Sequence, residues 1–446
     1  MVDSSLSLSF PFGSREVIAG FDGGSVSSDG GLLLLRRIER RLGLIARLSE
    51  CLTDRRQTSK VRQRIADMLR QRILGICLGY EDCNDFDTLC SDPMFKLATD
   101  RLPLTGADLA SQPTLCRFEN SVRRKELYRM SMALVDHFIA RHAQVQRIVL
   151  DIDATDDPAH GQQELEFFHG YYGRHCFLPL LAFASVDDSP EQELLGAVLR
   201  PGNKHAGHGT VSILKRLVAR LRAAYPKARI VLRGDAGFAL PAVYTFCEAE
   251  GLDYVLSLAK NRRLVEMAEP LLQEARDVCK KTACKARLFG EFSYAAQTWS
   301  HARRVIVKAE VMPAHGDNPR FVVTNIDQEE LSASALYDFY TDRGDVENRI
   351  KEMKDDLASG RTSCHRFAAN QFRLLLHAAA MVLMQALRGW LAGTDFAKMQ
   401  ASTLRAKLLK VGVRVTQTCR KIWLRLPTSF PWQTAWKTVW TATTQT

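Results

Sequence analysis

The chain has 446 residues, enough for two to four domains, and this length excludes a small scaffold held together by disulfides. Hydrophobic residues make up 46% of it and charged residues 25%, which are the proportions of a folded globular protein rather than a disordered one. The formal net charge of +11 suits a polyanionic partner.

Cysteine usage and hydropathy exclude two further classes. Eleven cysteines are scattered along the chain without one Cys-x-x-Cys pair, so neither a disulfide framework nor a zinc ribbon is expected, and reduced thiols fit a cytoplasmic protein. No basic segment followed by an apolar segment marks a secretory signal in the first 20 residues. The longest apolar stretch, residues 374–387, is too short to span a bilayer and predicts a buried helix with no membrane contact.

The positive charge is concentrated toward the two ends of the chain. Residues 35–75 hold twelve Lys/Arg and four Asp/Glu on a helical pattern, and the chain after Asp395 holds nine Lys/Arg and no acid. These segments carry +8 and +9, so the remainder carries −6. Basic ends around an acidic middle predict phosphate contacts at the ends and a cation held between them. For either segment alone, a solvated helical face is an equal explanation.

The expected elements alternate between helix and strand. Helices with a basic outer face are predicted in residues 35–75, strands at 148–153, 177–184 and 230–232, and a helix at 211–224. Strand-like blocks over 253–325 predict a β-rich insertion, and helical periodicity resumes over 332–354 and 368–390. This order predicts a mixed α/β fold.

Two aspartates follow predicted strands, where the functional groups of α/β sheets gather. Asp153 ends the strand at 148–153 and shares a face with Asp151, so we prefer Asp153 as the functional residue, with Asp151 as its support or substitute. Asp235 follows the strand at 230–232 in the segment Arg-Gly-Asp-Ala-Gly-Phe, whose glycines are expected to let the backbone turn sharply. Taken alone, each aspartate is better explained as a turn former or helix cap.

The predicted helix at 332–354 adds a third group of side chains. Steps of three, four and seven residues bring Tyr340, Arg343, Glu347 and Lys354 to one face, because successive helical residues turn by about 100°. That face would present a phenol, a guanidinium, a carboxylate and an amine together. Alternatively, Lys351 follows Glu347 at a spacing that stabilises an exposed helix through an ion pair.

These residues carry a resemblance to a known family. The spacing of Tyr340, Arg343, Glu347 and Lys354 matches the Tyr-x2-Arg-x3-Glu-x6-Lys signature of bacterial insertion-sequence DDE transposases, and the segments around Asp153 and Asp235 look like that family's two aspartate motifs. The three motifs occur in the family's order, with the insertion before the glutamate. The resemblance covers most of the chain, including residues 111–120, and is nearest to the insertion-sequence thirteen-eighty group.

The resemblance implies an RNase H-like catalytic core that is interrupted by a β-rich insertion. We expect a helical, basic DNA-binding region over residues 1–145 and the two parts of the core over 146–250 and 327–395. The insertion would occupy 251–326, and a basic C-terminal region would occupy 396–446.

The resemblance also implies the chemistry and the partners. Asp153, Asp235 and Glu347 are expected to be catalytic and to bind two Mg²⁺ ions, for which Mn²⁺ could substitute. The protein would bind terminal inverted repeats and target sequences in double-stranded DNA, and would carry out metal-dependent cleavage and strand transfer of the cut-and-paste type. We expect a homodimer in the synaptic complex and a cytoplasmic protein that joins the nucleoid when bound to DNA.

Six residues are candidate DNA contacts, and residues 35–75 are the candidate for recognising the terminal repeats. Trp299 is the only Trp in the insertion and would stack on an extruded base, although core packing explains it better. The six candidates are Tyr340, Arg343, Lys354, Lys351, Trp299 and Arg233. Two other classes stay open, namely a metal-dependent nuclease without strand transfer and an inactive DNA-binding descendant of a transposase.

Overall fold

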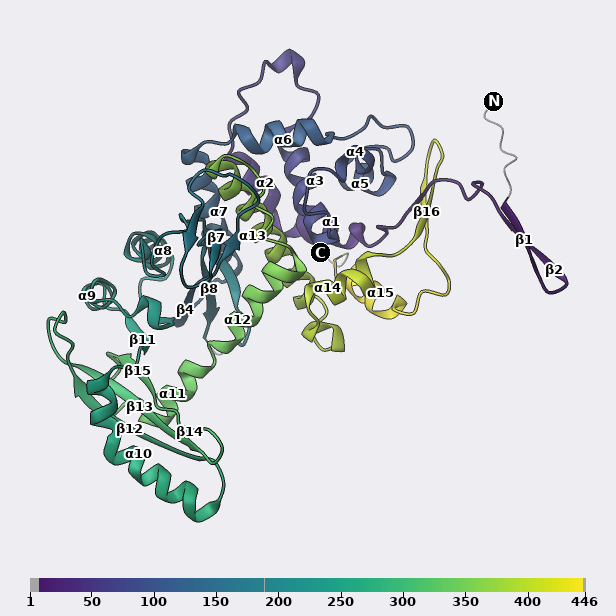
Figure 1. The fold of residues 1–446 in the computed structure, drawn as a ribbon. Coiled ribbons are helices and arrows are strands. Elements are labelled where there is room, and N and C mark those ends of the chain that lie inside the picture. The colour runs from purple at the N-terminus through teal and green to yellow at the C-terminus, as the bar shows by residue number, and fades with distance from the viewer. Residues whose placement is uncertain (1–7, 188, 444–446) are drawn as a thin grey trace. The chain divides into compact units, whose positions relative to one another are not determined.

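The computed structural model describes residues 8–187 and 189–443, which form two compact units (Figure 1). One unit combines Met1–Ser121, Asp356–Ala358 and Ala379–Thr446, and the other combines Val122–Asp355 with Ser359–Ala378. We call them the terminal unit and the central unit. The five-part division expected from the sequence stays a prediction; helix α7 (Arg124–Arg141), expected with the N-terminal helices, belongs to the central unit.

A nine-stranded mixed sheet organises the central unit, in the order β12-β13-β15-β11-β10-β4-β8-β9 with β14 beside β13. The strands β4, β10 and β11 run parallel, and β8, β9 and β15 are antiparallel to their neighbours. The bounds are β4 (Arg147–Ala154), β8 (Leu180–Val186), β9 (Glu193–Val198), β10 (Arg229–Gly234), β11 (Asp253–Leu258), β12 (Ala286–Tyr294), β13 (Arg303–Met312), β14 (Gly316–Asp317) and β15 (Arg320–Thr324). The mixed α/β fold and the strands at 148–153 and 230–232 are confirmed. The segment 177–184 is divided between β8 and a shorter strand, β7 (Arg174–Phe177). Strand β7 lies between β5 (Asp157–Pro158) and β6 (Phe167–His169) in a small separate sheet.

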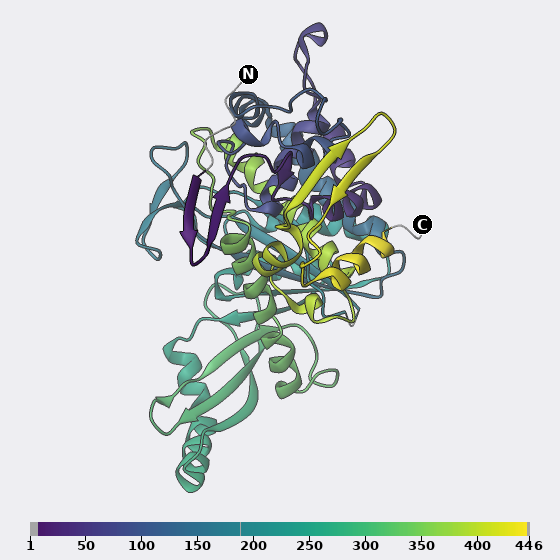
Figure 2. The same cartoon turned by 90° about the vertical axis from the view of Figure 1, so that its right-hand side faces the viewer.

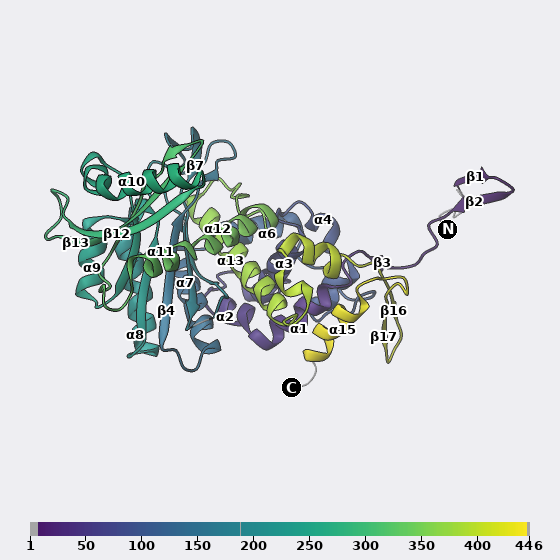
Figure 3. The ribbon, with the colours of Figure 1, turned by 90° about the horizontal axis from the view of Figure 1, so that it is seen from below.

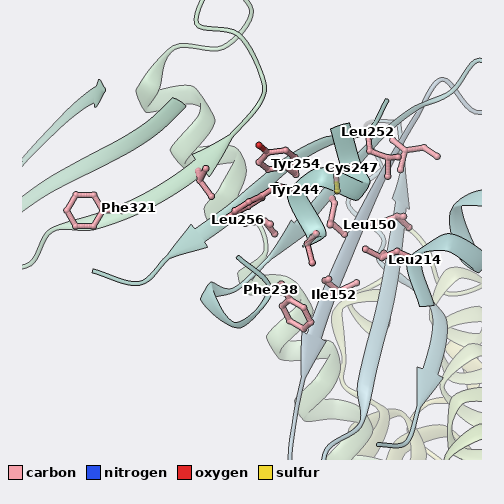
Figure 4. Close-up of a cluster of buried hydrophobic side chains, with 14 of the residues drawn as sticks. Leu150, Ile152, Leu214, Phe238, Tyr244, Cys247, Leu252, Tyr254, Leu256 and Phe321 are labelled. Carbon is pink, nitrogen blue, oxygen red and sulfur yellow. The ribbon is translucent and has the colours of Figure 1, made fainter. Parts of the chain in front are cut away.

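Alternation along the strands gives the sheet two distinct faces. On one face Ile148, Leu150 and Ile152 join a large apolar core with α7 and the helices α8 (Thr210–Ala224), α9 (Pro241–Ala249) and α10 (Arg262–Thr282) (Figure 4). On the other face Val231 packs with Leu336 of helix α11 (Ala333–Thr341). Because side chains alternate along a strand, Asp151 and Asp153 lie on the face that α11 covers.

The segment expected to be a β-rich insertion also contains the 21-residue helix α10. The apolar face of α10 includes Leu264, Ala268 and Leu272, which join the large core. Strands β12, β13 and β15 continue the main sheet beyond β11 rather than forming a sheet of their own. The expected strand blocks are therefore present, but helix α10 was not predicted, because a four-residue apolar spacing between the strand blocks was overlooked.

The helix expected over 332–354 is broken into three pieces. Helix α11 ends at Thr341, α12 runs over Gly344–Lys351, and a π-helical turn, η3, covers Glu352–Asp356. The backbone at Asp342 and Arg343 stays in the right-handed helical region, and the Arg343 amide donates to the Tyr340 carbonyl over 3.1 Å. A single tightened helical turn therefore joins α11 to α12. The face calculated for one ideal helix therefore does not apply to all four signature residues.

The terminal unit is mainly helical. Its elements are β1 (Leu8–Phe12), β2 (Arg15–Ala19), β3 (Val26–Ser27), α1 (Leu32–Leu42), α2 (Leu44–Glu50), η1 (Thr58–Lys60), α3 (Ile65–Leu78), α4 (Phe86–Leu89), α5 (Pro93–Ala98), α6 (Gln112–Ser121), η4 (Asp395–Lys398), α14 (Ala401–Leu404), η5 (Arg405–Leu409), β16 (Val413–Gln417), β17 (Ile422–Arg425) and α15 (Gln433–Ala442). The two ends of the chain meet in one three-stranded sheet, β17-β16-β3.

The helices of residues 35–75 do not present a uniformly basic outer face. Arg72 of α3 has no exposed surface and donates to Glu119 over 2.7 Å, and the buried Arg36 of α1 pairs with Asp100 over 2.6 Å. Exposed cations are instead concentrated in the loop 53–64, between α2 and α3. The expectation of a basic helical face was wrong for the buried arginines because the sequence pattern did not identify their acidic partners.

Helix α13 (Phe367–Gly389) contains the apolar stretch that was expected to be buried. By length and composition it could cross a membrane, but 83% of its most apolar 18 residues are buried. The burial confirms the expectation of an internal helix.

Candidate active site

Two neighbouring parallel strands bring Asp153 and Asp235 to the same edge of the main sheet. The β4–β10 register pairs Ile152 with Gly234, and each aspartate follows one member of that pair. The Asp153 carboxylate accepts a hydrogen bond from the Ala154 amide over 2.8 Å, and the Asp235 carboxylate accepts one from the Gly237 amide over 2.9 Å. Asp235 is thereby the N-cap of the short helix η2 (Ala236–Phe238), as the alternative explanation of this residue predicted.

The glycines around Asp235 serve close packing rather than an unusual turn. Neither Gly234 nor Gly237 has a positive φ. A Cβ atom at Gly237 would lie 2.7 Å from the Cβ of Ala206, and one at Gly234 would lie 3.1 Å from a methyl group of Leu256. The chain passes directly from β10 into η2 without a glycine-specific backbone conformation, and the segment needs glycine because neighbouring side chains leave no room.

Arg343 joins the first aspartate to the glutamate. Its guanidinium lies 2.8 Å from the Asp153 carboxylate and 2.9 Å from the Glu347 carboxylate. Arg343 is the N-cap residue of α12, and Glu347 lies in the first turn of that helix. The side chains of Arg343 and Asp153 are 7% and 14% exposed, whereas that of Glu347 is 64% exposed. The buried Arg343 Nε has no hydrogen-bond partner in the part of the chain that the structure describes.

The carboxylates and Arg343 shift one another's pKa values. Burial raises the pKa of Asp153 to about 6, and the charges of Asp235 and Glu347 add to the rise, while Arg343 opposes it. Burial lowers the pKa of Arg343, but Asp153, Asp235 and Glu347 outweigh it, and the net shift is upward. All three predicted carboxylates therefore lie close enough to influence one another, with one guanidinium compensating them.

Asp151 and Arg233 form a buried pair beside this site. The register of β4 and β10 places them opposite each other, and the guanidinium donates two 2.8 Å hydrogen bonds to the carboxylate. Asp151 has no exposed surface, Arg233 is 3% exposed, and a third hydrogen bond from Arg233 ends on the Phe339 carbonyl. Both side chains are thus used inside the sheet, and the burial of Arg233 is inconsistent with the predicted DNA contact.

The other signature residues lie at different distances from the carboxylates. Tyr340 is near enough to Arg343 to affect its pKa, and Lys354 donates from η3 to Thr155 over 3.0 Å and to Asp156 over 2.7 Å. Glu347 pairs with Arg343 rather than with the exposed Lys351, so the predicted stabilising pair on the helix surface is wrong.

The small sheet after β4 contributes residues that sequence reasoning missed. In the hairpin of β6 (Phe167–His169) and β7, Arg174 approaches Asp156 to 3.8 Å. Burial raises the pKa of Tyr172, in the turn of that hairpin, to about 12, and the carboxylates of Asp156, Asp153 and Asp235 contribute to the rise. The only sequence signal was the turn Gly-Tyr-Tyr-Gly, which does not reveal that the chain returns to the strand end.

Trp299 packs inside an aromatic group away from these carboxylates. Its ring centroid lies 5.1 Å from that of Tyr244 and 5.4 Å from that of Tyr294, and the Arg303 guanidinium lies 5.4 Å from it. These contacts favour the packing role over base stacking.

The donor set fits a hard divalent cation. Carboxylate oxygens are the ligands that Mg²⁺ prefers, and the charges of Asp235 and Glu347 add to the rise that burial causes in the pKa of Asp153. Within the described residues no group of three or more His, Cys, Asp or Glu side chains is arranged to hold a metal ion, and the Arg343 guanidinium contacts both Asp153 and Glu347. Binding a cation would require Glu347 to exchange that contact, which its exposed position on α12 allows.

Comparison with known families decides the general identity. A family model described as a transposase DDE domain, group 1, matches residues 10–446. The chain belongs to the DDE transposase family. No curated protein matched the chain in a sequence search. Membership makes it a transposase that acts on DNA by cleavage and transfer, and transposases of this kind generally use divalent metal ions.

Proposed function

We propose that this DDE transposase is a cut-and-paste enzyme of the insertion-sequence thirteen-eighty group that carries the Tyr-Arg-Glu-Lys signature. The observation that carries the proposal is the contact of Arg343 with both Asp153 and Glu347, beside Asp235. Carboxylates gathered at the end of parallel strands, with a guanidinium beside them, offer both metal ligands and a cationic group for a phosphate, which supports a metal-dependent phosphoryl-transfer site.

The sheet supports an RNase H-like core. Five neighbouring strands have the order β9-β8-β4-β10-β11, in which β4, β10 and β11 are parallel. Strand β8 is antiparallel to β4, and β9 is antiparallel to β8. Asp153 lies at the end of the central strand, β4. The second aspartate follows its parallel neighbour, and the glutamate comes from a helix later in the chain.

Asp153, Asp235 and Glu347 would hold Mg²⁺, with Mn²⁺ as an alternative. The bound metal would supply Lewis-acid activation of water and stabilisation of the charge on the leaving oxygen. In the first reaction a water oxygen bonds to the phosphorus at the element end, the P–O3′ bond breaks, and the 3′ oxygen takes up a proton. In the second, that 3′-hydroxyl loses its proton and its oxygen bonds to a target phosphorus, while the target P–O3′ bond breaks and the leaving 3′ oxygen takes up a proton.

The residues around the carboxylates would position the DNA. Arg343 would turn toward a phosphate oxygen once a metal takes over its carboxylate contacts, and Lys354 fixes Thr155 and Asp156 next to the strand end. Tyr340 and the exposed Lys351 lie on the same segment and would contact the backbone further along. The exposed basic loop 53–64 is the part of residues 35–75 best suited to the terminal inverted repeats. Two copies of the chain would pair the element ends in the bacterial cytoplasm.

The proposal is tested with Glu347→Gln, with Glu274→Gln as control because Glu274 is an exposed glutamate on α10. A labelled duplex carrying the element end and a plasmid target are incubated with Mg²⁺, and both cleavage and strand transfer are followed on gels. We expect Glu347→Gln to lose both activities while it binds the duplex as the wild type does, and Glu274→Gln to keep both.

The outcomes separate the candidate functions. Cleavage without joining in the wild type would favour a metal-dependent nuclease, and binding without cleavage would favour an inactive descendant. Normal cleavage by Glu347→Gln would contradict the assigned site itself.

A further inference from the structure

The C-terminal hairpin of β16 and β17 presents an exposed cationic face. The register places Arg414 directly opposite Arg425 and Thr416 opposite Trp423. Opposed residues of an antiparallel pair share a face, and Lys421 joins them because it precedes Trp423 by two residues. We call these residues the ribbon face: Arg414, Thr416, Lys421, Trp423 and Arg425. The two strands run side by side and project from the helices of their unit (Figures 2 and 3).

The other face of the hairpin anchors it to the terminal unit. Val413 and Val415 are buried, and the Val415 amide donates to the Ser25 carbonyl over 2.8 Å. The Gln417 side chain accepts from the Leu104 amide over 3.1 Å and donates to Thr105 over 2.9 Å. The hairpin is therefore held in place, so a ligand on the ribbon face would meet a preorganised surface.

The cations of the ribbon face have no anionic partner in the structure. Neighbouring cations nearer to α14 are used internally, since Lys410 lies 2.8 Å from Asp29 and Arg405 donates to backbone carbonyls. Arg414 and Arg425, in contrast, form no salt bridge with any carboxylate of the described residues, and no acidic residue follows Asp395 in the chain. Like charges directly opposite each other destabilise a hairpin, so this pair is unfavourable unless an anion lies over it.

Trp423 distinguishes this surface from a merely protected strand edge. β17 is an edge strand, and charged residues on edge strands commonly prevent aggregation. That explanation covers Arg425 but not Arg414, which lies on the inner strand β16. It also does not cover Trp423, a large aromatic side chain that is 49% exposed between Lys421 and Arg425, whose charged groups lie 5.6 and 5.8 Å from its ring.

We infer that the ribbon face is a DNA-binding surface, in which Arg414, Arg425 and Lys421 contact backbone phosphates and Trp423 packs against sugars or bases between them. A two-stranded ribbon is of a size that the major groove of duplex DNA admits. The phosphate contacts position the protein without reading sequence. The inference rests on the proposed function for the identity of the ligand, and it adds a second contact to the loop 53–64.

The test measures binding of the full chain to a short fluorescein-labelled duplex of arbitrary sequence by anisotropy, in EDTA, at several salt concentrations. The double variant Arg414→Gln/Arg425→Gln removes two phosphate contacts, so the slope of log affinity against log salt should become shallower by about 2. Arg414→Lys/Arg425→Lys keeps both charges and should keep most of the slope. Trp423→Ala should weaken binding with the slope unchanged, because the lost contact is not ionic.

The control is Lys280→Gln/Lys281→Gln, which removes two exposed cations from α10 and lowers the net charge equally. We expect this control to bind with the wild-type slope. Circular dichroism should give all four variants the wild-type spectrum, and the glutamine ribbon variant should melt no lower than the wild type because it loses the repulsion between Arg414 and Arg425. An unchanged slope in the glutamine ribbon variant, or an equal loss in the control, would overturn the inference. Because no cleavage is measured, a wild type that binds through the ribbon face but never cuts would contradict the proposed function and not this inference.

Discussion

Replacement of Arg233 by Met tests whether the pair under the candidate active site is structural. The substitution removes two 2.8 Å hydrogen bonds to Asp151 and a third to the Phe339 carbonyl, and it leaves a carboxylate with no exposed surface. Breaking such a buried pair costs about 3–5 kcal/mol. Burial raises the pKa of Asp151 and Arg233 opposes that rise, so the variant can limit the loss by protonating Asp151.

For a unit of this size the cost corresponds to a drop in melting temperature of roughly 6–20 °C. Thermal unfolding followed by circular dichroism measures it, and Arg320→Met is the control because Arg320 is exposed on β15. Asp151→Asn/Arg233→Met should recover part of the loss, since it leaves no buried charge. The reasoning is refuted if Arg233→Met melts like the wild type while its DNA affinity falls, because Arg233 would then be a DNA contact.

Three further predictions concern the carboxylates and their neighbours. The pKa of Asp153 is about 6 in the folded chain and about 3.9 in the unfolded chain, so the folded state binds more protons between these two pH values. The free energy of unfolding of the wild type, relative to that of Asp153→Asn, should therefore fall by about 3 kcal/mol as the pH rises from about 4 to 7. A difference between the two proteins that does not change with pH in metal-free melts would contradict this. Arg343→Ala removes the cation between Asp153 and Glu347, so Mg²⁺ should raise its melting temperature more than that of the wild type; an equal rise would exclude competition for one position. Lys354→Met removes the hydrogen bonds to Thr155 and Asp156 and should slow cleavage about tenfold or more. Lys351→Met should only weaken DNA binding and make the slope of log affinity against log salt shallower by about 1. Gel and anisotropy assays that give the two variants the same profile would refute these separate roles.

The sequence predicted the parts of the core that depend on local patterns. The β-branched runs that became β4 and β10 end at Asp153 and Asp235, and parallel pairing of neighbouring strands explains why the two carboxylates meet. The spacing of Arg343 and Glu347 at i and i+4 also correctly indicated that these side chains can touch.

The remaining features depend on contacts between distant segments. Arg233 pairs with Asp151 because the strand register places them opposite each other. Tyr172 lies near the carboxylates because the β6–β7 hairpin folds back toward the end of β4. No short sequence pattern indicates either contact. The π-helical turn at Lys354 could not be foreseen because an ideal 100° step assumes an unbroken helix. For Arg72, a charge count gave a basic surface, whereas its partner Glu119 is 47 residues away in the chain.

The central claim is that Asp153, Asp235 and Glu347 form a metal-dependent site that cuts DNA at the end of the element. The most direct measurement incubates the wild type with a labelled duplex carrying that end, in Mg²⁺ or in EDTA, and resolves the strands on a denaturing gel. The account predicts a cut at the element boundary in Mg²⁺ and none in EDTA. Intact strands under both conditions, or the same cut in EDTA, would contradict it.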